Sequence, residues 1–274
     1  MTVMRTRAAI VLAGAAATVC IPLAVRADDN AQSDPTSLAS QCAGLPSHQV
    51  LQNALTDARN AANGGFNLDM WGTVVNRDGV VCAVAFTGLT RGDQWPGSRV
   101  ISAQKANTAN AFSLPGLALS TANLYSAVSP GGSLYGLQHS NPVDTETAYR
   151  GPATSFGAGD DPMMGHRIGG VNVFGGGLAL YRTVNGNKVL LGAVGVSGDS
   201  SCADHNIAWR TRHNLNLDHV PAGVSGDNAR PDNIVYDITP QPGQQEGVSA
   251  HGWGHPECSA AATAAAAGLP PTRP

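Results

Sequence analysis

Basic charge is scarce in this sequence of 274 residues, whose formal net charge is −3 at pH 7. Its only lysines are Lys105 and Lys188. Proteins that bind nucleic acids gather lysine and arginine to displace counterions from phosphates, so the composition argues against a nucleic-acid partner. Aromatic residues make up only 5% of the chain, whereas 33 residues are glycine. This balance predicts a domain with many turns and close backbone contacts.

Long apolar runs are missing beyond the N-terminus. Residues 8–25 carry no charge, follow Arg5 and Arg7, and lead into Ala24-Val-Arg-Ala27. A basic start, an apolar stretch and a small–x–small cleavage pattern are typical of a secretory signal peptide. An uncleaved membrane anchor is the alternative, since the run approaches the length of a spanning helix. The cleavage pattern favours removal of residues 1–27, a secreted or periplasmic location, and no membrane span in the mature chain.

Cysteine is also sparse. Removal of the signal peptide, which contains Cys20, leaves four cysteines, namely Cys42, Cys82, Cys202 and Cys258. An even number in an oxidising compartment predicts two disulfides, although the count leaves their pairing open. A zinc site built from all four thiolates is disfavoured, because no two of these cysteines are close in sequence.

Apolar periodicity and turn signals predict an α+β fold. Asn76-Arg-Asp-Gly79 and Asn185-Gly186 each separate two strand-like runs, as hairpin turns do. Two hairpins favour an antiparallel sheet with flanking helices over a parallel one. The expected order is a helix after Ser47, strands 70–75 and 80–86, helix 98–112, an irregular insert 115–161, strands 168–174, 178–182 and 189–196, helix 201–214, and a further strand near 234–238.

These features divide the chain into segments. We expect a flexible polar leader over residues 28–44 and the folded domain over 45–220. An irregular extension follows over 221–258. The last segment, 259–274, is dominated by alanine and proline and is predicted to be disordered.

One motif suggests a hydrolase. Ser102-Ala-Gln-Lys105 matches the Ser-x-x-Lys signature of serine β-lactamases. That mechanism also needs a Lys-Thr-Gly segment and a Ser-Asp-Asn segment, and the sequence contains neither. The match is therefore interpreted as chance, and no hydrolase activity is predicted.

Histidine is the residue type most suggestive of a ligand site. His166 lies between the insert and the third predicted strand, where a loop can close over a planar ligand, and His205 lies at the start of the last predicted helix. Neutral imidazole is a common ligand of haem and transition metals. Any single histidine is more often a surface or hydrogen-bonded residue, and no His-x-x-x-His zinc pair supports either one on these helices.

Two segments together resemble a known family. The stretch Lys105-Ala-Asn-Thr-Ala-Asn-Ala-Phe112 resembles the Lys-Ala-x-Thr-Ala-x-x-Phe helix of the HbpS/GlcG-like haem-binding, or haem-degrading domain, family. Gly169-Gly-Val-Asn172 and Leu191-Gly-Ala-Val-Gly-Val-Ser-Gly198 are similar to the closing strands of that family. The resemblance implies a profilin- or PAS-like layered domain with an antiparallel five-stranded sheet.

The same resemblance implies a function. Members bind haem, often form homo-oligomers, and in some cases break haem down with release of iron. The expected function is therefore that of an exported haem-binding protein, with haem degradation as an open question. The alternative is a non-enzymatic extracellular module of the same fold that binds another small molecule or assembles with a partner.

The resemblance also suggests which residues serve the ligand. Lys105 and, as a second candidate, Arg167 would meet the haem propionates, and Thr108 would be a weak ligand or hydrogen-bonding group. His166 is the first choice for the axial ligand of the iron, and His205 is the second.

A PAS-like sheet also bears on the disulfides. In such a sheet the final strand lies beside the first, and Cys82 and Cys202 are then close. The implied disulfides are Cys82–Cys202 and Cys42–Cys258, the latter joining the leader to the extension.

Overall fold

The computed structural model describes residues 35–239, 242 and 247–274 of a unit that spans 33–274. The predicted signal peptide and the first part of the leader lie outside the described residues. Of the helices within the described ranges, none has the length and apolar character needed to cross a membrane.

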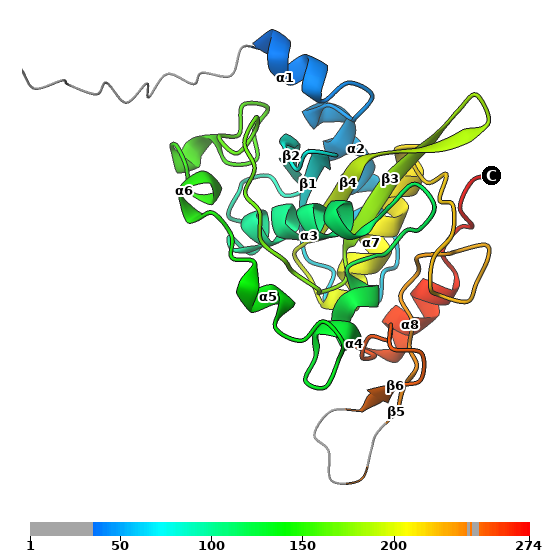
Figure 1. Ribbon diagram of the computed structural model, residues 1–274. Coiled ribbons are helices and arrows are strands. Elements are labelled where there is room, and N and C mark those ends of the chain that lie inside the picture. Colours follow the sequence, from blue (N-terminus) through cyan, green and yellow to red (C-terminus); the bar gives the residue numbers. More distant parts are fainter. Residues whose placement is uncertain (1–34, 240–241, 243–246) are drawn as a thin grey trace, which may run out of the picture. The chain divides into compact units, whose positions relative to one another are not determined.

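Helices and strands alternate irregularly along the unit (Figure 1). The α-helices are α1 (Pro35–Gln41), α2 (His48–Arg59), α3 (Ser98–Phe112), α4 (Tyr125–Val128), α5 (Leu137–Ser140), α6 (Thr145–Ala148), α7 (Ser201–Asn214) and α8 (Ala260–Ala267). Two short 3-10 helices are η1 (Ala122–Leu124) and η2 (Ala153–Ser155). The strands are β1 (Trp71–Asn76), β2 (Val81–Phe86), β3 (Gly177–Val184), β4 (Asn187–Ser197), β5 (Ile238–Thr239) and β6 (Val248–Ser249).

The main sheet has four strands in the order β2-β1-β4-β3, and every neighbouring pair is antiparallel. The predicted α+β class with an antiparallel sheet and flanking helices is confirmed. The prediction of a fifth strand in the main sheet is wrong. Residues 168–174 form no strand, and only isolated bridges occur at Arg167 and Gly169. Gly169 and Gly170 have φ values of 61° and 79°, which interrupt an extended backbone. Near 234–238, only Ile238 enters a strand, in the separate pair β5–β6.

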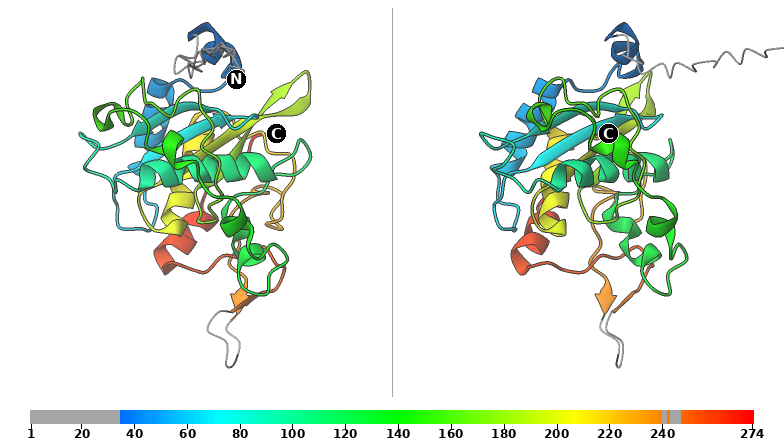
Figure 2. Two further views of the ribbon diagram at one scale, coloured as in Figure 1. Left: turned by 60° about the vertical axis from the view of Figure 1, so that its left-hand side comes forward. Right: turned by 90° about the vertical axis from the view of Figure 1, so that its left-hand side faces the viewer.

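Helices cover both faces of this sheet. Figures 1 and 2 show α3 against one face and α2 and α7 against the other. The strands are accordingly buried on both sides: Val74 of β1 packs with Leu51 and Leu55 of α2, whereas its neighbour Val75 packs with Val100 of α3. Alternate residues of a strand point to opposite faces, so each helix layer has its own apolar core.

The approach of α3 to β4 requires a glycine. A Cβ atom at Gly195 would lie 1.9 Å from the carbonyl oxygen of Ser102 on α3. That contact is impossible for any side chain, so Gly195 lets the helix backbone pack directly on the strand. The sequence Leu191–Gly198, which carried part of the resemblance, thus has a packing role.

The insert 115–161 is anchored in the protein interior. Arg99 of α3 forms a buried, two-pronged ion pair with Asp161, and its guanidinium stacks 3.7 Å from the ring centre of Phe156. The Asp161 carboxylate also accepts hydrogen bonds from the backbone N–H groups of Gly157 and Met163. These contacts fix the insert beside α3.

Two disulfides are present, as predicted, but the predicted pairings are wrong. Cys42 is joined to Cys82 and Cys202 to Cys258, instead of Cys82 to Cys202 and Cys42 to Cys258. The physical reason is the sheet order, because Cys82 lies on the edge strand β2 and is separated from β4 by β1. Cys202 begins α7, where the returning C-terminal segment brings Cys258 alongside.

The ends of the unit are also more ordered than the sequence suggested. Residues 35–44 of the leader contain α1 and are tied to β2 by the Cys42–Cys82 disulfide. The segment 259–274, predicted to be disordered, contains α8, whose Ala262 and Ala266 are buried against the core. Ser259 caps this helix, since its side chain accepts a hydrogen bond from the Ala262 N–H.

Candidate functional site

The segment that carries His166 lies along the free edge of β2. Gly165 N–H donates to the carbonyl oxygen of Val81, and Val81 N–H donates to the carbonyl oxygen of His166, both at 2.9 Å. These two bonds fix the backbone on either side of the imidazole. The His166 ring is half-buried and therefore remains reachable from the surface.

Arg150 lies beside this imidazole. Its guanidinium Nη1 is 3.2 Å from Nε2 of His166 and can donate a hydrogen bond to it. Partial burial and the positive charge of Arg150 both lower the pKa of His166. The imidazole is thus held in the neutral form that binds metals. Sequence reasoning missed Arg150, although it is the one arginine or lysine of the predicted insert.

Arg167 follows His166 and is exposed. Its Nε donates to the carbonyl oxygen of Asp78 in the β1–β2 turn at 2.6 Å. The structure therefore brings His166 and Arg150 into contact, and the exposed Arg167 follows His166 directly in the chain. We call these three residues the β2-edge cluster.

Lys105 and Thr108 are not part of that cluster. Lys105 is completely buried, and its Nζ donates to Asp204 at 2.7 Å and to the Val196 carbonyl oxygen at 3.0 Å. Burial lowers the pKa of Lys105 and raises the pKa of Asp204 to about 6, although the opposite charge of each partner acts against these shifts. Thr108 is also fully buried: its hydroxyl donates to the Gln104 carbonyl oxygen and accepts from the Asn172 N–H.

His205 is enclosed as well. It is fully buried on α7, and its Nε2 accepts a hydrogen bond from the Ile234 N–H at 3.1 Å. Burial lowers the pKa of His205 to about 4, so its imidazole is neutral at pH 7. Its Nδ1 is buried without a hydrogen-bond partner. The predicted candidates Lys105, Thr108 and His205 thus lie in the interior, whereas His166 and Arg167 are reachable from the surface.

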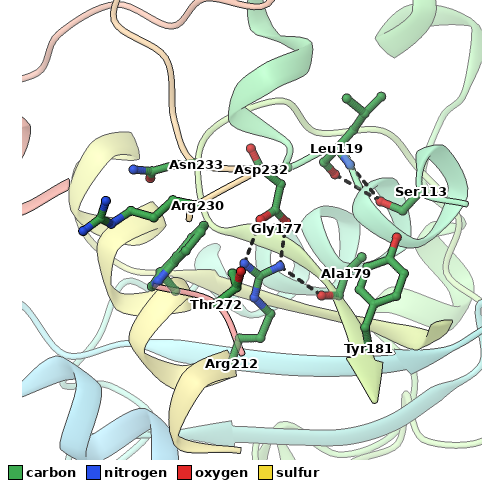
Figure 3. A network of polar contacts seen from close by, with 12 residues as sticks. Ser113, Leu119, Gly177, Ala179, Tyr181, Arg212, Arg230, Asp232, Asn233 and Thr272 are labelled. Atoms are coloured by element: carbon green, nitrogen blue, oxygen red, sulfur yellow. Dashed lines mark hydrogen bonds and ion pairs between the residues drawn. The ribbon is translucent and has the colours of Figure 1, made fainter. Parts of the chain in front are cut away.

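A third buried ion pair holds α7 to the C-terminal half. Figure 3 shows the guanidinium of Arg212 between the Asp232 carboxylate and the Ala179 carbonyl oxygen of β3. The distances are 2.6 and 2.8 Å to the two carboxylate oxygens and 3.1 Å to the carbonyl oxygen. The pair joins the segment before β5 to the sheet and closes the core over α7.

The start of α7 gathers further reactive side chains. The Cys202–Cys258 disulfide lies there, and His255 is buried beside it with its Nε2 2.8 Å from the Ser201 hydroxyl. Burial lowers the pKa of His255 to about 4. Sequence reasoning missed His255, because it lies in a segment read as an irregular extension.

The geometry offers no support for a serine nucleophile. The Ser102 hydroxyl lies 2.7 Å from the Thr73 hydroxyl and donates to the Arg99 carbonyl oxygen, while Lys105 pairs with Asp204. Among the described residues, Ser102 therefore contacts hydroxyl and carbonyl oxygens, and Lys105 is paired with Asp204.

A surface pocket lies beside the C-terminal end of α2. It is formed by residues between Arg59 and Leu68 together with Asp199 and Ile207. The Asp199 carboxylate accepts hydrogen bonds from the backbone N–H groups of Phe66 and Leu68, at 2.9 and 3.2 Å. None of the described residues that line this pocket is a histidine, methionine or cysteine, so it offers no donor suited to iron.

A comparison with solved structures finds several that are similar to part of this chain. Protein ORFY of Klebsiella pneumoniae is 24% identical, with a TM-score of 0.40, over 61% of this chain and 86% of that one. The PduOC:heme complex is 23% identical, with a TM-score of 0.42, over 62% and 91% of the two chains. HbpS is 17% identical, with a TM-score of 0.38, over 61% and 88%. None of the curated proteins compared with the chain matches it.

Family membership rests on the sequence itself. The family described as "Haem degrading protein HbpS-like" matches residues 47–212, which is more than half of the chain and contains α2, the four-stranded sheet and most of α7. The chain belongs to the HbpS-like family of haem-degrading proteins.

Proposed function

We propose that this protein is exported and binds ferric haem at the β2-edge cluster. The observation that carries the proposal is a half-buried, neutral imidazole, His166, in contact with the exposed Arg150 guanidinium and followed in the chain by the exposed Arg167, in a member of the HbpS-like family. Haem presents one iron and two propionates, so an imidazole with two cations has the matching chemistry.

Each residue of the cluster has a distinct task. His166 would donate an imidazole nitrogen to the iron, and its fixed backbone limits the positions that the ring can take. Arg150 would leave Nε2 of His166 and turn toward a propionate, which an exposed arginine can do at little cost. Arg167 would bind the other propionate by charge-assisted hydrogen bonds.

The interior candidates fit haem less well. Lys105 and Thr108 are satisfied by protein partners, and a propionate that reached Lys105 would have to displace Asp204. His205 has the chemistry of a ligand, but iron could reach its buried Nδ1 only after α7 or the segment around Ile234 moved. We assign His205 a structural role.

Bound haem would bring redox chemistry to the site, and the protein would supply binding and electrostatics. Degradation is a separate claim from binding. A reductant or peroxide added to the complex tests it: bleaching of the Soret band with release of iron shows breakdown, and a stable band shows binding alone.

A hemin titration of the mature chain tests the assignment. The wild type should give a saturable Soret shift at one haem per chain, and His166→Ala should weaken binding at least tenfold. His251→Ala is the matched control, because the His251 side chain is 77% exposed beside β6 and should leave binding unchanged. Equal affinities of the wild type and His166→Ala would remove the ligand assignment. No saturable shift in the wild type would favour the alternative, a module of this fold without haem.

Export and assembly belong to the same proposal. The two disulfides suit an oxidising compartment, which supports cleavage of the predicted signal peptide. We also propose a homo-oligomer, because a second copy could cover a ligand that the β2 edge leaves exposed. Light scattering with and without hemin tests this: a mass of at least two chains is expected, and a monomer in both conditions would contradict it.

A further inference from the structure

A second group of ligand atoms lies at the start of α7, away from the β2-edge cluster in sequence. The sulfur atoms of Cys202 and Cys258 and a ring nitrogen of His255 all lie within 4.8 Å of one another. Thiolate and imidazole are the donors preferred by zinc and similar cations. His255 and Cys258 are also three residues apart, a spacing common for paired zinc ligands.

The backbone already places these three side chains around one point. Cys202 and Cys258 are joined as a disulfide with Cα atoms 6.0 Å apart, and Nδ1 of His255 lies 3.9 Å from the Cys202 sulfur. Cys202 is fully buried, whereas Cys258 is exposed. The exposed side chain can turn and separate the two sulfurs without moving α7.

The surroundings would stabilise thiolates and orient the imidazole. The Cys202 N–H, in the first turn of α7, donates to the Cys258 sulfur at 3.2 Å, and a helix N-terminus favours negative charge. His255 Nε2 lies 2.8 Å from the Ser201 hydroxyl, which in turn accepts from the Gly175 N–H at 2.7 Å. A hydrogen bond on the far ring nitrogen is the usual means of orienting a histidine that binds metal.

We propose that reduction of the Cys202–Cys258 disulfide converts this place into a binding site for one Zn²⁺ ion, held by Cys202, His255 and Cys258. Nδ1 of His255, which now lies 2.7 Å from the Pro256 carbonyl oxygen, becomes the nitrogen ligand, and Nε2–H then donates to Ser201. Three protein ligands leave the fourth position of a tetrahedral ion to water.

The redox step requires an external two-electron reductant, and a dithiol is one example. One of its thiolates attacks the exposed Cys258 sulfur, the protein S–S bond breaks, and Cys202 leaves as a thiolate. The second thiolate of the dithiol then attacks the mixed disulfide and releases Cys258. The dithiol is oxidised to a cyclic disulfide, the protein gains two electrons and two protons as two thiols, and Zn²⁺ binding returns those protons to solvent. Reoxidation of the pair would expel the ion, so the site couples metal binding to redox state.

The other disulfide provides an internal control. Within the part of the chain that the structure describes, no third ligand completes such a cluster around Cys42 and Cys82. The Cys202→Ser, Cys258→Ser double variant keeps Cys42 and Cys82 and should bind no metal after reduction. Any non-specific affinity of reduced thiols would appear equally in this variant.

Cobalt provides the optical probe, since Co²⁺ occupies zinc sites and absorbs in the visible. Protein reduced with a phosphine and titrated without oxygen should bind one Co²⁺, with thiolate charge-transfer bands and the d–d bands of tetrahedral cobalt. Zn²⁺ should displace it. His255→Ala should weaken cobalt binding more than about tenfold, and the oxidised wild type should show none of these bands. Cobalt bands of equal strength in the double serine variant would overturn the proposal.

Circular dichroism keeps the test decisive if reduction loosens the fold. If the reduced wild type stays folded, absence of tetrahedral cobalt bands overturns the proposal. If it unfolds, Zn²⁺ should restore the native spectrum of the wild type but not of the His255→Ala variant. Failure of Zn²⁺ to restore it would also overturn the proposal. Neither arm uses hemin, so the result is independent of haem binding.

Discussion

At the scale of single residues, the interior charges act in pairs. Lys105 and Asp204 are both buried, and each is stable there because the other is present. Removal of one partner from a buried pair leaves an unpaired charge and costs about 3–5 kcal/mol. Asp204→Asn should therefore lower the free energy of unfolding by about that amount, measured by urea denaturation. The double variant Lys105→Met, Asp204→Asn should recover part of the loss; no recovery would contradict the pairing.

His205 makes stability depend on pH in a defined direction. Burial lowers its pKa from 6.5 to about 4; Arg212 and His255 also lower it, and Asp232 and Asn233 oppose the shift. Below pH 6.5 the His205 imidazole binds a proton in the unfolded chain but stays neutral in the folded protein. Stability should therefore fall as pH drops from about 6.5 to about 4, by up to ~1.4 kcal/mol per pH unit.

The variant His205→Asn isolates this contribution, because every other titrating group is common to both proteins. Urea denaturation at pH 7 and pH 5 gives the loss of unfolding free energy between the two pH values. This loss should be about 1–2 kcal/mol smaller in the variant than in the wild type. The same loss in both proteins would show that His205 does not supply this pH dependence.

At the scale of elements, a substitution next to α8 tests whether the C-terminal segment packs as part of the core. Leu269, just after α8, is 1% exposed, and Trp209 of α7 donates its indole N–H to the Pro270 carbonyl oxygen. Leu269→Ala should destabilise the protein by about 2–5 kcal/mol in urea denaturation. Leu89, which is 99% exposed, provides the matched control, and Leu89→Ala should change stability by less than about 0.5 kcal/mol. Equal effects of the two variants would mean that α8 does not pack as described.

Local signals in the sequence predict some elements well and others poorly. The turns Asn76–Gly79 and Asn185–Gly186 and the helix after Ser47 were predictable, because hairpin chemistry and capping act within a few residues. Residues 168–174 look like a strand by composition, but Gly169 and Gly170 take positive φ values instead. Helix α8 was missed because its alanine-rich sequence resembles a disordered tail, and only packing on α7 shows its role.

At the scale of the whole molecule, contacts between segments that are distant in the chain could not be predicted from the sequence. The pairing of four cysteines depends on sheet order and on the return of the C-terminal segment to α7. The contact between Arg150 and His166 joins an insert to a sheet edge, and no local pattern indicates it. Of the predicted ligand residues, those chosen from the matching helix, Lys105 and Thr108, lie in the core. Shared motifs therefore predicted the fold, whereas the ligand residues stay predictions.

The central claim, that His166 binds haem iron, is tested most directly by the magnetic resonance of the ferric complex. Protein labelled with ¹⁵N-histidine and loaded with hemin should show ¹⁵N hyperfine coupling from an axial imidazole in pulsed electron paramagnetic resonance. The account predicts this coupling in the wild type and in the control variant His251→Ala, and its loss in His166→Ala. The same ¹⁵N coupling in His166→Ala, or a wild-type complex without any, would contradict it.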